Sequence, residues 1–323
     1  MGFLDFILGK KETFYVDSRE IIIHLKTKEK IDFLDLKEKI IDFCKTNSFS
    51  KNFPKLTFLI EDKVRDHANA WVSDYEIIKG RNIMHFNGKF VLYDQKMTGK
   101  LFPEDTLLKA MEHEIIHLWH DFKSKQIQKQ SGNLAKLSAQ INVAQIFKIV
   151  YPKSLLNKHQ ENFRLLLANF IINLYIEGLA EYISYLERES LNFSQRLFND
   201  TYYIELRNIK YVLRVIDQAF NKKYKTDSTS STDLFKNISK VLKAKAYSIG
   251  SNMVYSILYI DHDMNIDKIA ILDIFKFIRK YESCMKKVNL KPLVSLTSGE
   301  GIIDYKILVN QIWIMNKEDK SDN

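Results

Sequence analysis

Hydrophobic and polar residues follow two different periods along this 323-residue chain. Between residues 13 and 62, a strand pattern at 20–25 is followed by a helix pattern at 31–43 and a second strand pattern at 55–60. β-branched and aromatic residues mark the strands, and apolar residues at steps of three and four mark the helix. This part of the chain therefore predicts a small sheet with a helical connection.

More strands are expected before residue 102. Residues 70–75 read as one strand, and residues 82–86 and 89–93 flank the dipeptide Asn87-Gly88. Asn-Gly favours tight hairpin turns, because both turn positions require positive φ. We therefore expect a β-hairpin at this point. Its second strand, near residues 90–93, is the expected sheet edge that pairs with an extended substrate.

The helical period dominates after residue 103, and no internal repeat interrupts it. The sequence predicts an α+β fold in which a small N-terminal mixed sheet leads into a large, mostly helical C-terminal part. Three regions are expected: residues 1–102, residues 103–260, and residues 261–323 with a polar tail. The expected helical segments are 132–150, 157–186, 194–220, 234–260, 266–280 and 304–315.

A further predicted helix, which precedes these segments, carries the motif His113-Glu114-Ile115-Ile116-His117, which has the form H-E-x-x-H. A helix start is predicted at residues 103–106, where Pro103 suits the first turn. Residues i and i+4 lie on one helix face, so the two imidazoles can share one Zn²⁺. Glu114 then lies beside a water bound to that ion.

The apolar positions of the same helix support this interpretation. They recur at steps of three and four and predict one stripe that packs into a core, opposite the histidines. This leaves the histidine face for a metal site. The positions of the stripe are Leu108, Met111, Ile115, Leu118 and Phe122.

A catalytic zinc usually has three protein ligands, so the histidine pair needs a partner. His120 lies about 10 Å along the helix axis from His113, too far to share an ion. His159 stands among polar residues without a supporting pattern. Glu177 is favoured, because Glu177 and Glu181 share one face of an apolar helix in which buried carboxylates require a metal or strong hydrogen bonds.

Gly178 follows Glu177 directly. Glycine is unfavourable inside a helix, so its presence there predicts the close approach of another helix.

Charge and cysteine content narrow the possible functions. The formal charge is +9, but the lysines are spread along the chain, and the one dense block is residues 222–225. A solvated lysine surface is expected, without a clear nucleic-acid signal. Cys44 and Cys284 are isolated, which excludes a disulfide framework and a cysteine zinc site. A reducing compartment, the cytoplasm, is expected.

No secretory signal is expected at the N-terminus, because the apolar run in residues 1–11 is short. These residues predict a packed or frayed helical turn, with a weak membrane-surface contact as the alternative. The longest apolar stretch, residues 163–186, includes Arg164 and several Asn and Glu residues, which favours a buried helix over a membrane span. No pattern indicates the oligomeric state.

The order of motifs resembles that of the gluzincin zinc metallopeptidases of the peptidase MA-like superfamily. In that family H-E-x-x-H is followed by W-x-x-E-G-x-A-E-Y, which this chain matches at Glu177-Gly178-Leu179-Ala180-Glu181-Tyr182. The resemblance implies a zincin-like fold and a peptide or protein substrate. It also implies that Glu177 is the third zinc ligand and that Glu181 orients the first histidine.

A third, looser match is the segment Tyr247-Ser248-Ile249-Gly250, which is similar to the later Y-x-x-G helix of these enzymes. In the aminopeptidase branch, the tyrosine of that helix donates a hydrogen bond to the oxyanion, which implies this role for Tyr247. The resemblance covers roughly residues 68–260, so residues 103–260 form the expected metal-binding catalytic region.

Two features depart from the family pattern. From residue 117 to residue 177 the gap is 60 positions, which is longer than the usual gluzincin spacing. The excess predicts an inserted helix at residues 132–150. A G-x-M-E-N-type strand, which the aminopeptidases carry, is absent from the sequence, and this argues against aminopeptidase activity.

Together these observations predict a hydrolase in which Zn²⁺ activates a water and Glu114 is the general base. Two alternatives remain open at this stage. One is a SprT-like protease acting on DNA-bound proteins, which uses a third histidine and would suit the basic charge. The other is a non-catalytic, zinc-stabilised binding or scaffold protein that uses residues 1–11 and the lysine-rich surface.

Overall fold

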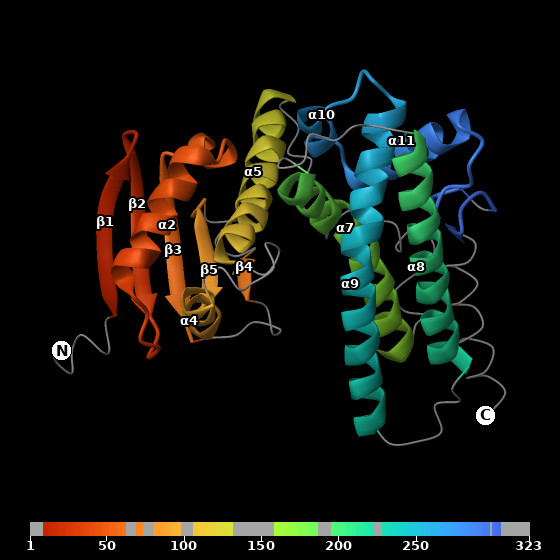
Figure 1. The fold of residues 1–323 in the computed structure, drawn as a ribbon. Coiled ribbons are helices and arrows are strands. Elements are labelled where there is room, and N and C mark those ends of the chain that lie inside the picture. Colours follow the sequence, from red (N-terminus) through yellow and green to blue (C-terminus); the bar gives the residue numbers. More distant parts are fainter. Residues whose placement is uncertain are drawn as a thin grey trace. The chain divides into compact units, whose positions relative to one another are not determined.

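The computed structural model describes residues 9–62, 69–73, 80–97, 106–131, 158–186, 195–221, 228–297 and 299–304. Side chains are described in these ranges except at 124–131, 158–169, 185–186, 216–221, 228–237 and 304. The chain divides into two compact units, residues 1–126 and residues 127–323. A mixed sheet forms the first unit and helices dominate the second (Figure 1), which confirms the α+β class.

The sheet of the N-terminal unit has five strands in the order β1-β2-β3-β5-β4. The three inner strands run parallel, and β1 and β4 pair antiparallel at the two edges. The prediction of a small mixed sheet is therefore confirmed. The strand bounds are β1 Lys10–Val16, β2 Arg19–Lys26, β3 Lys55–Glu61, β4 Ala70–Val72 and β5 Ile83–Asn87.

Helix α2 (Phe33–Thr46) connects the parallel strands β2 and β3, as a parallel pair requires. The Asp32 side chain accepts hydrogen bonds from the backbone N–H groups of Leu34 and Asp35, which caps the first turn. The buried face of α2 packs on the sheet, where the rings of Phe43 and Phe58 meet edge to face at 6.2 Å. A short 3-10 turn, Phe49–Asn52, precedes β3.

The predicted hairpin at Asn87-Gly88 is wrong. Gly88 begins helix α4 (Gly88–Lys96), and the Asn87 side chain caps it by accepting the Lys89 N–H at 2.9 Å. Asn is as good an N-cap as a turn residue, and Asn87 has an extended backbone with φ −71°. The glycine is needed for space, because a Cβ on Gly88 would lie 2.2 Å from the Thr27 hydroxyl oxygen.

The substrate-edge strand predicted near residues 90–93 is therefore wrong as well, because those residues lie inside α4. Among the described residues, the edge of the sheet next to β5 is β4. The strand at the second edge of the sheet, β1, was not predicted. It includes Lys10 and Lys11, which belong to residues 1–11, the segment considered above for a membrane-surface contact. Residues 1–8 of that segment lie outside the described residues.

Long helices form most of the C-terminal unit. Helix α9 (Ser228–Ile260) lies beside both α7 (Lys158–Leu186) and α8 (Gln195–Asn221) (Figure 1). The predictions at 157–186 and 194–220 are confirmed to within one residue at each end, and the helix predicted at 234–260 is confirmed with a start six residues earlier. The predicted helix at 132–150 lies outside the described residues, as does most of the one at 304–315.

The helix predicted at 266–280 is divided into α10 (Ile266–Ala270) and α11 (Ile274–Lys287). Each has its own N-cap, because the side chain of Asn265 accepts the Lys268 N–H and that of Asp273 accepts the Lys276 N–H. Two short parallel strands, β6 (Val294–Ser295) and β7 (Ile303–Asp304), follow. The helical pattern after residue 103 does not predict these two strands, and the rest of the described C-terminal unit is mostly helical, as expected.

Candidate metal centre

Helix α5 (Leu107–Ser131) carries the H-E-x-x-H motif. Its first described turn is held from outside the helix: the Leu107 N–H donates to Asp94 Oδ1 at 2.8 Å, and the Lys109 N–H donates to Thr106 Oγ1 at 3.3 Å. Thr106 is therefore the capping residue, and the predicted start at Pro103 lies outside the described residues. Asp94 also accepts a hydrogen bond from Lys39 Nζ at 2.9 Å, which connects α2, α4 and α5.

The buried side of α5 agrees with the predicted stripe at Met111, Ile115 and Leu118. Leu107 replaces Leu108 as the first buried position, and Trp119 is also buried, with its ring edge-on to Phe49 at 4.9 Å. Apolar packing of this kind fixes the rotation of the helix about its axis. It leaves His113 and His117 half-buried on another face, as the sequence predicted.

The two histidines lie close together, with their Nε2 atoms 3.1 Å apart and their ring centroids 4.8 Å apart. Two ligands of one tetrahedral zinc, each about 2.0–2.1 Å from the ion, are about 3.3 Å from each other. The two Nε2 atoms therefore have the separation that a shared metal ion requires. Without metal, the same distance suits a hydrogen bond between one protonated and one unprotonated nitrogen.

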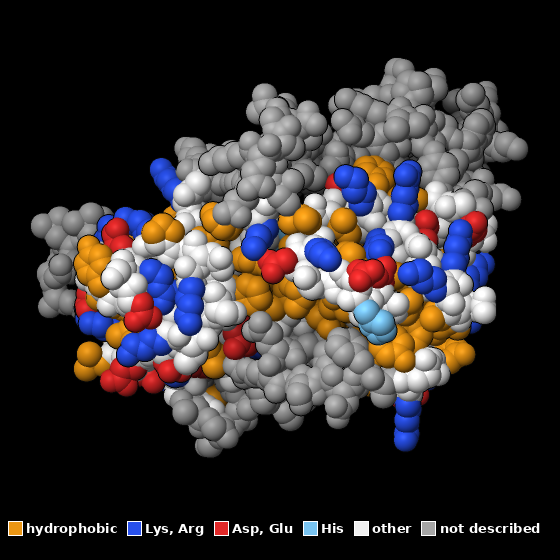
Figure 2. All heavy atoms as spheres, turned by 90° about the horizontal axis from the view of Figure 1, so that it is seen from above, with side chains coloured by type: hydrophobic (Ala, Val, Ile, Leu, Met, Phe, Trp, Pro, Cys, Tyr) orange, Lys and Arg blue, Asp and Glu red, His pale blue; other side chains and the backbone are white. Residues whose placement is uncertain are grey.

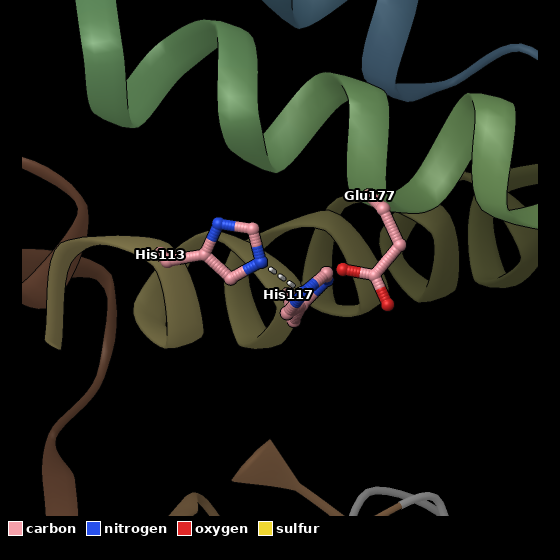
Figure 3. A group of neighbouring side chains, drawn as sticks. All are labelled: His113, His117 and Glu177. Carbon is pink, nitrogen blue, oxygen red and sulfur yellow. Dashed lines mark hydrogen bonds between the residues drawn. The ribbon is translucent and has the colours of Figure 1, made fainter. Parts of the chain in front are cut away.

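Glu177 completes the group. One ligand atom each from His113, His117 and Glu177 lie within 4.8 Å of one another, so the three residues can hold a metal ion. Figure 3 shows the Glu177 carboxylate directed toward the His117 ring. Among the described residues, no other group of three or more His, Cys, Asp or Glu side chains has such an arrangement.

Helix α7, which carries Glu177, is fixed within its own unit by the residues around this glutamate. The Tyr175 hydroxyl lies 2.7 Å from the carbonyl oxygen of Ile269, and its ring stacks on Phe277 at a centroid distance of 4.6 Å. Burial raises the pKa of Tyr175 far above its usual value, so the hydroxyl keeps its proton and acts as a donor. Glu177 thus extends from a part of α7 that is fixed two residues earlier.

Gly178 is the point at which α7 meets α9. A Cβ on Gly178 would lie 2.4 Å from the backbone carbon of Gly250, and a Cβ on Gly250 would lie 2.0 Å from the carbonyl oxygen of Leu174. The two helix backbones therefore touch, which confirms the close approach predicted from Gly178. This contact places Tyr247, half-buried and one turn before Gly250, on the helix that packs directly against Glu177's helix.

The remaining predicted residues have different outcomes. Glu114 is buried, with 7% of its surface exposed, and Glu181 and Tyr247 are half-buried. Their catalytic or orienting roles stay predictions. His120 is buried and is not part of the three-residue group, as expected. The side chain of His159 lies outside the described residues.

A polar cluster on the sheet was not predicted. His85 Nδ1 lies 2.7 Å from Glu61 Oε1, and the Trp71 ring stacks on the His85 ring at 5.2 Å. The sequence signal for this cluster is a histidine at the centre of an apolar strand. Its partners, Glu61 and Trp71, depend on how the strands pair. Trp71 is opposite His85 only in the register of β4 on β5, and the sequence does not specify that register.

Comparison of the chain with family models, with curated proteins and with solved structures gave no match. None of the helices in the described part of the chain has the length and apolar character that a membrane span requires.

Proposed function

We propose that this protein is a zinc-dependent metallopeptidase of the gluzincin type. The observation that carries the proposal is the convergence of His113, His117 and Glu177 with their ligand atoms within 4.8 Å of one another. The H-E-x-x-H motif alone predicts two ligands and a base. The third ligand comes from the second motif, and its position supports the same assignment.

The donor set favours zinc over other common ions. Two imidazole nitrogens and one carboxylate oxygen form the protein ligand set of many catalytic zinc sites, which keep a fourth position for water or substrate. Calcium and magnesium prefer oxygen donors throughout. The 3.1 Å separation of the two Nε2 atoms also suits the small tetrahedral ion.

A zinc ion bound here would lower the pKa of a water molecule and polarise the scissile carbonyl. Glu114, next to His113 on the same helix, takes the proton of the attacking water and returns it to the leaving amine. Burial of Glu114 keeps bulk water away from this carboxylate. Glu181 is proposed to orient His113, and Tyr247 to donate a hydrogen bond to the oxyanion.

An extended peptide is proposed to bind along β4 in place of the wrongly predicted edge strand. The Asn87 N–H donates to the Asn69 carbonyl oxygen at 2.8 Å, which makes Asn69 and Asn87 a hydrogen-bonded pair. In an antiparallel pair such positions alternate, so Ala70 and Val72 direct their N–H and C=O groups away from β5. These groups can pair with a substrate strand independently of its sequence.

The first experiment compares metal content with turnover. Wild type is expected to purify with one zinc ion per chain and to cleave casein or a peptide library. Glu114→Gln should keep the zinc and lose activity about 100-fold or more, because only the proton transfer is removed. Glu112→Gln, two residues earlier on the same helix, is the matched control and should keep both. Equal cleavage by Glu114→Gln and wild type would exclude the proposed peptidase mechanism.

The second experiment tests the ligands. His113→Ala, His117→Ala and Glu177→Ala should each lose zinc, measured by elemental analysis after dialysis. His262→Ala removes an exposed histidine elsewhere in the chain and should retain it. Retention of zinc by Glu177→Ala together with its loss from His159→Ala would support the three-histidine, SprT-like alternative. If wild type binds zinc but cleaves no peptide, the non-catalytic scaffold alternative would be supported.

A further inference from the structure

Helix α8 has a buried side and an exposed side. The side that packs in the helical unit is formed by Phe198, Tyr202, Glu205, Ile209 and Val212, all buried. The opposite side, centred on Arg207, Lys210 and Arg214, is exposed. These three cations lie at steps of three and four residues and so form one row, about 10 Å long, on the outer face of the helix.

Acidic residues are sparse around this row. Residues 206–216 contain no Asp or Glu, and neither do residues 234–260, which make up most of α9. The carboxylate that precedes the row on α8, Glu205, is buried and accepts hydrogen bonds from Asn208 and Ser248. The one that follows it, Asp217, has a side chain outside the described residues. By contrast, Arg196 near the start of α8 pairs with Asp200 at 3.8 Å.

An exposed aromatic ring lies beside the row. Tyr211 is 42% exposed, and its ring centroid lies 6.0 Å from the guanidinium carbon of Arg214 and 6.0 Å from Lys245 Nζ of α9. Lys245 is held in place by its hydrogen bond to Asn208 Oδ1 at 2.9 Å. Cations from two helices thus lie next to a partly exposed aromatic ring.

We propose that this basic surface, formed by Arg207, Lys210, Arg214, Lys245 and Tyr211, binds single-stranded nucleic acid. Such binding combines cations that follow the phosphate backbone with aromatic rings on which bases stack. The chain carries a formal charge of +9, which attracts polyanions from a distance. Figure 2 shows one face of the molecule, on which Lys and Arg side chains are more frequent than Asp and Glu.

An anionic membrane is the competing polyanion, and the packing of α8 argues against it. A helix that lies in a membrane interface buries its apolar face among the lipids. The apolar face of α8 is already buried in the helical unit, through residues such as Phe198 and Ile209. The exposed side of α8 presents three cations and two tyrosines, Tyr203 and Tyr211, beside a single exposed isoleucine, Ile204, and the partly exposed Leu197. This mixture suits phosphates and bases better than the interior of a lipid layer.

The test measures fluorescence anisotropy of a labelled oligothymidine of 20 nucleotides with the full-length protein. Binding should weaken steeply between about 50 mM and about 200 mM NaCl, because phosphate contacts release counterions. The triple variant Arg207→Glu, Lys210→Glu, Arg214→Glu should bind at least about tenfold more weakly and show a shallower salt dependence. Tyr211→Ala should lose about tenfold through stacking, and Tyr211→Phe should bind as wild type does.

The matched control carries the same change in net charge at exposed lysines of the other unit: Lys30→Glu, Lys51→Glu, Lys89→Glu. Equal weakening by the control and the α8 variant would overturn the proposal, because net charge alone would then explain binding. Absence of oligonucleotide binding at low salt would overturn it as well. So would co-sedimentation with phosphatidylserine vesicles that the α8 variant abolishes while oligonucleotide binding persists. Zinc content of the α8 variant reports separately on the metal centre and should be unchanged.

Discussion

At the scale of single residues, the positions of the candidate metal ligands depend on groups that are not ligands themselves. Tyr175 and Gly178 flank Glu177 on both sides, the first through its hydroxyl and the second through the absence of a side chain. Asp94 holds the start of α5, the helix that carries the histidines, by accepting its first N–H. These residues decide where the ligand atoms lie.

Gly250 gives a sharp prediction at this scale. In Gly250→Ala the new Cβ would lie 2.0 Å from the Leu174 carbonyl oxygen, so α7 and α9 must move apart. Overpacking of this kind costs about 1–3 kcal/mol and exceeds the gain in helix propensity. Urea denaturation followed by circular dichroism should show the loss. Ala244→Ser, at an exposed position of α9, is the control, and a Gly250→Ala variant as stable as wild type would contradict the contact.

At the scale of elements, the contact between α8 and α9 contains a buried carboxylate. Glu205 accepts hydrogen bonds from Asn208 at 2.9 Å and from Ser248 at 3.1 Å. Burial raises the pKa of Glu205 above its usual value, although these two hydrogen bonds and Lys245 partly oppose the shift. The folded protein therefore holds this proton more tightly than the unfolded chain does.

The sign of the pH effect follows from that difference. Between the ordinary pKa of a glutamate and the raised pKa of the folded state, the folded protein binds more protons. The contribution of Glu205 to the free energy of unfolding is therefore largest at low pH and falls as pH rises through this window. Urea denaturation of wild type and Glu205→Gln from pH 4 to pH 7 should show that wild type loses stability relative to the variant as pH rises. A constant difference would contradict the raised pKa.

Elements differed in how far the sequence determined them. The inner strands and long helices were predictable, because their apolar residues repeat over several turns or pairs. The structure at Asn87-Gly88 was not predictable, because the same two residues suit a hairpin turn and a helix N-terminus. Glycine is required at position 88 because a Cβ there would clash with Thr27, which is distant in the sequence. Likewise, His113 and His117 were placed by local spacing, whereas the partners of His85 required the register of the sheet.

At the scale of the whole molecule, residues from widely separated parts of the chain supply the ligand atoms. The unfolded chain offers no such arrangement, so the binding of a metal ion by these three residues would be coupled to folding. A ligand that binds only the folded state stabilises it according to its concentration relative to its dissociation constant.

Zinc should accordingly raise the thermal unfolding temperature. At a free zinc concentration 100 times the dissociation constant, the gain in the free energy of unfolding is about 2.7 kcal/mol. Differential scanning calorimetry of chelator-treated protein, with and without added zinc, measures this gain. His113→Ala should show none, and Glu114→Gln should show the full effect. An equal gain in wild type and His113→Ala would place the stabilising ion elsewhere.

The contact between Gly178 and Gly250 has a consequence for how the protein is made. A ribosome completes the histidine pair of α5 long before it adds Gly250, on which the packing of Glu177's helix depends. At about 5–20 residues per second, the 133 positions from His117 to Gly250 take on the order of ten seconds. During synthesis the nascent chain therefore carries both histidines, and later Glu177, before the helix that holds Glu177 can pack on α9. In the proposed enzyme, hydrolytic competence would then arise only after Gly250 has been added, well after the H-E-x-x-H motif itself is complete.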